Sequence, residues 1–207
     1  AAAKNYNDVT VITSSNNYND LIEQLKKYNG STTLEFRKKM SQLAFVETAY
    51  YDSLIANYFN KISSLDFPAK KVTHYSLLDR LRYGENPHQK AAVYSQDGKH
   101  RINQIHGKSL SYNNYNDIFS ALTISKSFPK NAGVVILKHS NPCGVSVIKH
   151  NLMSYRAALA CDPISAFGGI VSCNFKIKRN LAVELNKLFL EVIIANGFDS
   201  NAIKILN

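Results

Sequence analysis

Two adjacent side chains, Lys138 and His139, have the residue types for acid–base chemistry and directly follow a short apolar segment. A strand is expected at 133–137, and residues 138–144 then read KHSNPCG. Histidine is well suited to move a proton near neutral pH, and a neighbouring lysine can stabilise a developing negative charge. Because open α/β sheets place their sites outside the carboxyl ends of strands, we predict a small-molecule site here. The residue types alone leave a structural role for His139 open.

A second polar segment, 81–89, reads LRYGENPHQ and gathers a guanidinium, a phenol and an imidazole around Gly and Pro. The planar fork of Arg82 matches a phosphate or a carboxylate, and Tyr83 follows it directly. Two interpretations stay open for this segment, a rigid surface that recognises an anion and an ordinary solvated turn.

Two more segments have the composition of ligand-binding loops. The segment 107–114 ends in Asn113 and Asn114, which indicate either the N-cap of a helix or an amide in contact with a ligand. The segment 165–169 reads SAFGG, and Gly168 with the glycine after it allows either close approach of a ligand or a tight turn into the next strand.

The elements that must position these residues alternate between strand and helix. Helices are expected at 21–29, 34–59, 116–128, 152–161 and 181–189, and strands at 9–13, 91–94, 101–106, 133–137, 169–173 and 192–195. Thr32 with Glu35 predicts a capping box before the second helix. The segment Asp66–Lys71 interrupts the pattern and places a domain boundary near residue 66. The alternation implies βαβ units, an α/β fold class and a largely parallel sheet.

The composition of the 207 residues is that of an ordinary globular protein, with 45% hydrophobic and 19% charged residues. No apolar run approaches the ~20 residues of a membrane span, and no signal-peptide layout opens the sequence, so we expect a cytoplasmic protein. Cys143, Cys161 and Cys173 predict neither a disulfide framework nor a zinc site. The net charge of +10 leaves nucleic acid or a polyanionic small substrate open as partner. Considered by itself, Lys4 near the start of the sequence is expected to be an exposed, solvated charge.

Several of these strings together resemble the family of bifunctional purine biosynthesis proteins, which join an AICAR transformylase to an IMP cyclohydrolase. Residues 82–89 are similar to the family's RYGENPHQ, 138–144 to KHxNPCG, 161–169 to CDPxSAFGG and 189–195 to FxEVIIA. The opening AAAKN and the TAYYD at 48–52 are similar to its cyclohydrolase part. The motifs occur in the family's order and extend over the whole chain.

The resemblance implies formyl transfer from the co-substrate 10-formyltetrahydrofolate to AICAR, and closure of formyl-AICAR to IMP. On the matched positions, His139 would take the proton from the attacking amine with Lys138 beside it, and Lys4 would act in ring closure. The residues implied to contact the nucleotide are Arg82, Tyr83, Asn113, Phe167, Gly168 and Glu191. No metal ligand is implied, and a monovalent cation is left open.

The resemblance also implies a fold and an assembly. Residues 1–66 would be the C-terminal part of a methylglyoxal-synthase-like cyclohydrolase domain, and 67–207 the first part of a cytidine-deaminase-like transformylase domain. The family implies a homodimer that shares its transformylase sites, with no membrane partner.

Two positions depart from the family pattern, because Tyr6 replaces a histidine and Asn196 replaces a proline. We expect the chain to be an internal piece across the junction of the two domains, with little activity alone. A basic nucleic-acid-binding module and an inactive remnant of the enzyme are the rival hypotheses.

Overall fold

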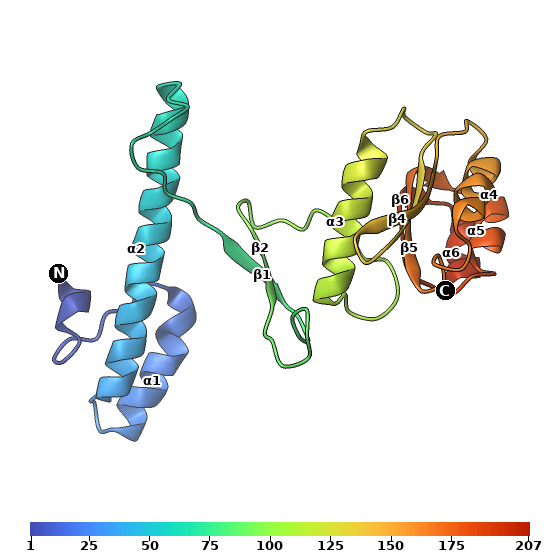
Figure 1. The fold of residues 1–207 in the computed structure, drawn as a ribbon. Coiled ribbons are helices and arrows are strands. Elements are labelled where there is room, and N and C mark those ends of the chain that lie inside the picture. Colours follow the sequence, from blue (N-terminus) through green and yellow to red (C-terminus); the bar gives the residue numbers. More distant parts are fainter. The chain divides into compact units, whose positions relative to one another are not determined.

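The computed structural model describes all residues 1–207, which form two compact units, 1–76 and 77–207 (Figure 1). The units divide at 76/77, whereas the sequence placed a boundary near residue 66. None of the helices is both long and apolar enough to cross a membrane.

The first unit is helical. It contains two short 3-10 turns, Ala2–Asn5 and Ser15–Asn17, and the helices α1 (Tyr18–Lys27) and α2 (Leu34–Ile62). The N-cap of α2 is Thr33, one residue after the predicted Thr32, and its hydroxyl accepts a hydrogen bond from the Phe36 amide at 3.2 Å. The strand expected at 9–13 does not form. A strand needs a partner for its backbone groups, and no strand pairs with this segment.

The second unit contains two sheets. Strands β1 (Ser76–Arg80), whose first residue is the last of the first unit, and β2 (Ala92–Ser95) form the smaller one. The larger sheet has the order β4-β3-β5-β6, with bounds Asn141–Ser146, Val134–Lys138, Gly169–Ile177 and Leu190–Phe198. Only β5 and β6 pair in parallel, while β3 is antiparallel to both β4 and β5. The expectation of a largely parallel sheet is therefore wrong, and the fold is mixed α/β.

A two-residue hairpin causes the difference in strand direction. The chain leaves β3 at Lys138 and returns at once as β4, and such a short connection can only join antiparallel strands. The sequence treated 141–144 as a loop because Asn, Pro and Gly are typical of turns. A strand expected at 101–106 is absent, and strand β1 and helix α6 (Ser200–Leu206) were not expected.

Helix α3 (Tyr112–Lys126) begins earlier than predicted. Its N-cap is Ser111, whose hydroxyl accepts from the Asn114 amide, while the Asn114 side chain accepts from the Ser111 amide, both at 3.1 Å. This capping box satisfies two backbone donors that the helix itself leaves unpaired. Asn113 and Asn114 therefore lie in the first turn of α3 and do not form its N-cap.

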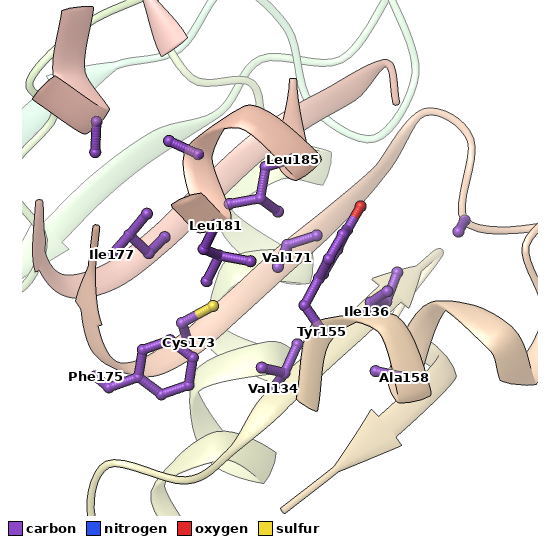
Figure 2. Packing of buried hydrophobic residues seen from close by; sticks show 13 residues of the cluster. Val134, Ile136, Tyr155, Ala158, Val171, Cys173, Phe175, Ile177, Leu181 and Leu185 are labelled. Atoms are coloured by element: carbon purple, nitrogen blue, oxygen red, sulfur yellow. The ribbon is translucent and has the colours of Figure 1, made fainter. Parts of the chain in front are cut away.

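The core lies on both faces of the larger sheet. Val134 and Ile136 of β3 face α4 (Asn151–Cys161) and α5 (Arg179–Leu185), which contribute Tyr155 and Leu181 to the same cluster (Figure 2). The members of the second cluster, on the opposite face, are Ile118, Ala121, Val135, Leu137 and Ile170. Because successive side chains of a strand point to opposite faces, the apolar run of β3 is buried on both sides between α3 and the other helices.

The strand β4 packs closely on α4 through a glycine. A Cβ atom added at Gly144 would lie 1.8 Å from the carbonyl oxygen of Ala158. The glycine of the NPCG string thus allows the backbone of β4 to approach the helix.

Candidate functional site

Lys138, His139 and three further candidate residues of the second unit, Phe167, Gly168 and Glu191, lie at one end of the larger sheet. Because β3 is antiparallel to β5, and β5 is parallel to β6, the carboxyl end of β3 lies beside the amino ends of β5 and β6. The rule that sites lie at the carboxyl ends of strands therefore applies to β3 only. Phe167 and Gly168 precede β5, and Glu191 is the second residue of β6.

The turn between β3 and β4 has an unusual backbone. Lys138 pairs with Asn141, and the two residues between them, His139 and Ser140, have φ values of 51° and 61°. This is the left-handed geometry of a type I′ hairpin, which favours Asn and Gly. Residues other than glycine cost about 1–3 kcal/mol each in this conformation. The His139 side chain is exposed, and no hydrogen bond or ion pair holds its imidazole.

Side chains from α3 hold this turn. Asp117 Oδ1 accepts hydrogen bonds from the Ser140 amide at 2.8 Å and from the Ser140 hydroxyl at 3.2 Å. The Asn116 amide donates to the same hydroxyl at 3.0 Å. The sequence analysis missed Asp117, because a single carboxylate inside a helical segment carries no signal of a contact 23 residues away.

Lys138 binds the loop that precedes β5. Its Nζ donates to the Phe167 carbonyl at 2.8 Å. The Phe167 ring lies 5.4 Å from the ring of Phe189, and the Gly168 amide donates to the Phe189 carbonyl at 2.8 Å. Gly168 has a φ of 70°, which is typical of glycine. The SAFGG segment at 165–169 therefore forms a tight turn beside Lys138.

Glu191 is joined to the start of α3. The Asn114 side chain donates to Glu191 Oε2 at 2.8 Å while it also completes the capping box. Its neighbour Asn113 is exposed and makes no hydrogen bond through its side chain. The resemblance implies a nucleotide contact for Asn113, which stays a prediction, and the structure brings its neighbour Asn114 into contact with Glu191.

The thiol of Cys143, just beyond the turn, is not activated. Burial raises its pKa, the nearby Asp162 carboxylate raises it further, and the Lys138 ammonium opposes both. Asp162 stays ionised because hydrogen bonds from Ser165 lower the pKa of its carboxyl. Because its pKa is raised, Cys143 remains a neutral thiol near pH 7. Only the thiolate is a strong nucleophile, so Cys143 is unreactive there.

Arg82 and Tyr83 lie on the loop after β1. The Arg82 guanidinium carbon is 5.6 Å from the centre of the Tyr83 ring, and a hydrogen bond of 2.8 Å from the Gly84 amide to the Gln89 carbonyl closes the loop. Arg82 lines a hollow of about 420 Å³ that Tyr115 of α3 also lines. No hydrogen bond joins this loop to Lys138 or His139. The structure thus presents Arg82 to a pocket but does not bring it into contact with the turn.

Lys4 lies in the first unit and is exposed. The backbone around it is bound to α2: Ser41 Oγ donates to the Ala3 carbonyl at 2.5 Å, and Arg37 donates to the Tyr6 and Asn7 carbonyls at 2.9 and 2.7 Å. These contacts fix the short turn that carries Lys4. The groups implied in the two reactions therefore belong to different units of the chain.

The fold and the site describe a mixed α/β protein with a cluster of polar and charged side chains at one end of its larger sheet. A model of the AICARFT/IMPCHase bienzyme family matches residues 2–207, and the chain belongs to this family.

The similar proteins include several named bifunctional purine biosynthesis protein PurH. The one from Bradyrhizobium diazoefficiens is 42% identical over 212 residues, which is 100% of this chain and 40% of that protein. The one from Thermoanaerobacter sp. is 42% identical over 210 residues, 100% of this chain and 41% of that protein. The one from Rhodospirillum rubrum is 44% identical over 206 residues, 98% and 39% respectively. The chain thus spans about 40% of the length of the relatives it matches.

Proposed function

We propose that the chain takes part in de novo purine biosynthesis and carries part of the site for formyl transfer from 10-formyltetrahydrofolate to AICAR. The observation that carries this proposal is the turn at His139, an exposed imidazole on a left-handed backbone directly after Lys138. Strained backbone conformations of this kind cluster at active sites, ligand clamps and switch regions. Membership of the AICARFT/IMPCHase family supports the choice of substrates.

In the proposed reaction the 5-amino nitrogen of AICAR attacks the formyl carbon of the co-substrate. His139 takes the proton that the amine loses. A general base of this kind raises the rate of a reaction about 10²–10⁴-fold. The formyl oxygen becomes negative as the carbon becomes tetrahedral, and the Lys138 ammonium would stabilise that charge. The bond from the formyl carbon to N10 of the folate then breaks, and N10 leaves with a proton as tetrahydrofolate.

The other residues implied by the family bind the nucleotide in this proposal. Arg82 and Tyr83 would hold its phosphate end, because a guanidinium matches phosphate. Glu191, with Asn114 fixed against it, would accept a hydrogen bond from an amino or hydroxyl group of AICAR. Phe167 and Gly168 would border the site next to Lys138, and Asn113 is retained as a candidate contact.

The first unit would contribute to ring closure of formyl-AICAR. We propose that 1–66 belongs to the cyclohydrolase domain and 67–207 to the transformylase domain. Lys4, on the turn that Arg37 and Ser41 fix, would be the group that acts in cyclisation. The complete enzyme would work as a cytoplasmic homodimer, and a monovalent cation is a further candidate component.

A calorimetric titration tests nucleotide binding by the chain itself. AICAR should bind, AMP should bind less tightly, and Arg82→Ala should weaken AICAR binding about tenfold or more, because the loss of a charged partner costs 1.5–3 kcal/mol. Arg156→Ala is the matched control, since this guanidinium pairs with Glu184 away from the site. Equal loss in both variants would mean that Arg82 has no specific role.

A chimera tests the chemistry. The segment of the Thermoanaerobacter relative that matches this chain is replaced by residues 1–207, and tetrahydrofolate formation is followed by absorbance. His139→Ala should lower kcat by about 10²-fold or more with little change in the KM for AICAR, because a general base acts in the transition state. A chimera that stays active with His139→Ala would contradict the proposed role of this residue. A chain that binds no AICAR together with an inactive chimera would contradict the proposed function.

A further inference from the structure

The turn that carries His139 has an unfavourable backbone and one side-chain hydrogen bond of its own, from the Asn141 amide to the His139 carbonyl at 2.9 Å. Its two central residues, His139 and Ser140, both occupy left-handed backbone conformations, and neither is Gly, the residue that adopts them at no steric cost. A contact from outside the hairpin adds to this bond and stabilises the turn further against relaxation to a right-handed form.

Asp117 supplies that contact. Its Oδ1 accepts both the backbone N–H of Ser140 at 2.8 Å and the Ser140 hydroxyl at 3.2 Å. The backbone N–H belongs to the peptide that joins His139 to Ser140, so the carboxylate fixes the plane of the peptide immediately after the imidazole-bearing residue. Asp117 is half-buried and forms no ion pair with any cation. Its hydrogen-bonding capacity is thus available to the turn.

The helix behind Asp117 is itself rigidly placed. Ile118, the next residue of α3, is buried against Val135 and Leu137 of β3, the strand that leads into the turn. The carboxylate is therefore anchored to the same sheet whose end it holds. By contrast, the His139 imidazole has no hydrogen bond of its own, so its position depends on the backbone beneath it.

We propose that Asp117 is a positioning residue for formyl transfer: it keeps the His139–Ser140 turn left-handed and thereby fixes where the His139 imidazole meets the substrate amine. This rests on the proposed function. Asp117 acts through the turn and does not touch the substrate. Its loss should affect the chemical step more than binding.

Three variants separate anchoring from other roles. Asp117→Ala removes the acceptor. Asp117→Asn keeps an oxygen that can accept from the Ser140 amide and removes the charge. Asp117→Ala combined with Ser140→Gly restores a residue that adopts the left-handed conformation without an anchor. Asp199→Ala is the matched control, because Asp199 also accepts from a backbone amide, that of Ala202 at 2.6 Å, at the opposite end of β6.

The first readout is the shape of the turn in the 207-residue chain. Three-bond HN–Hα couplings and Cα chemical shifts in NMR spectra report φ at His139 and Ser140. Asp117→Ala should move both residues away from left-handed values, while Asp117→Asn and the double variant should retain them. An unchanged turn in Asp117→Ala would overturn the proposal, whatever the activity.

The second readout is steady-state kinetics in the chimera described above. Asp117→Ala should lower kcat about tenfold to a hundredfold, because a misplacement of about 1 Å costs up to about 10²-fold, with the KM for AICAR changed less than about twofold. Asp117→Asn and the double variant should recover most of the rate, and Asp199→Ala should keep it. Two outcomes would overturn the proposal. One is a double variant whose turn is restored but whose kcat is not, and the other is an equal loss of kcat in Asp117→Asn and Asp117→Ala.

The two proposals fail in different ways. A chimera without substitutions that transfers no formyl group would contradict the proposed function, and the NMR measurements would still decide whether Asp117 holds the turn. An active chimera whose kcat does not respond to Asp117→Ala would contradict the positioning role and leave the proposed function intact.

Discussion

The carboxylate of Glu191 accepts a hydrogen bond from the side chain of Asn114 at 2.8 Å, although the two residues are 77 positions apart. Asn114 simultaneously caps α3 through the backbone of Ser111. The start of β6 and the start of α3 are therefore linked by one amide, and the orientation of Glu191 depends on a helix cap.

This link predicts different effects for two substitutions of Glu191. Glu191→Ala should weaken AICAR binding about tenfold, because it removes a charged partner and frees Asn114. Glu191→Gln should weaken it less, since the new amide oxygen can still accept from Asn114. Calorimetric titration of the chain measures both. Equal affinities in the native chain and in Glu191→Ala would exclude Glu191 from the nucleotide site.

A methyl group at Gly144 should destabilise the second unit. Because the added Cβ would lie 1.8 Å from the Ala158 carbonyl oxygen, strand and helix must separate, at a cost of about 1–3 kcal/mol or more. Gly197→Ala is the control, since its nearest neighbour lies at an ordinary 3.8 Å, and it should change stability by less than about 0.5 kcal/mol. Urea unfolding monitored by circular dichroism compares them, and similar midpoints would show that β4 does not pack on α4 as described.

The three cysteines should react with iodoacetamide in a fixed order. Cys161 is exposed and should be alkylated first. Cys143 should react more slowly at neutral pH, because its raised pKa lowers the fraction of thiolate. Cys173 is buried, and burial raises its pKa to about 12, so it should react only on unfolding. Mass spectrometry of timed samples measures the order, and early labelling of Cys173 would contradict its place in the core.

Glu184 should make stability depend on pH. Hydrogen bonds from Lys187 and Arg156 lower its pKa below the ordinary 4.5. The contribution of the Glu184 carboxylate to the free energy of unfolding is therefore fully present above pH 4.5, its ordinary pKa. It is lost as the pH falls through the lowered pKa of the folded state. Glu184→Gln should lower Tm at neutral pH and have no such effect in acid, once both states are protonated. A Tm difference that persists unchanged in acid would mean that the charge of Glu184 is not the cause.

Much of the fold follows from local signals. The run Val134–Leu137 is apolar on both faces, which predicts a strand between two layers. The helices expected at 34–59 and 152–161 form as α2 and α4. The strand β4 was not predicted, because its first four residues, NPCG, have the composition of a turn. The NPCG string is part of a hairpin whose glycine packs on a helix, and only the three-dimensional arrangement shows this.

The candidate site was predicted to a lesser extent. Lys138 and His139 were identified by residue type, and the other residues by resemblance to the family. The contacts of Asp117 and Asn114 were not found, because each joins segments far apart in the sequence through one hydrogen-bonding side chain. The structure also accounts for one departure from the family pattern: the Asn196 side chain donates to the Asn174 carbonyl at 2.7 Å, a bond that proline cannot make.

The left-handed turn should also link positions 117 and 140 in evolution. A chain that loses the acceptor oxygen at position 117 should need glycine or asparagine at position 140 to keep the turn, and a chain with glycine at 140 should no longer need an acceptor at 117. Natural relatives should therefore vary at these two positions together, and drift at either one alone should be rare. Selection on His139, the proposed general base, would then be visible at positions 117 and 140 as well.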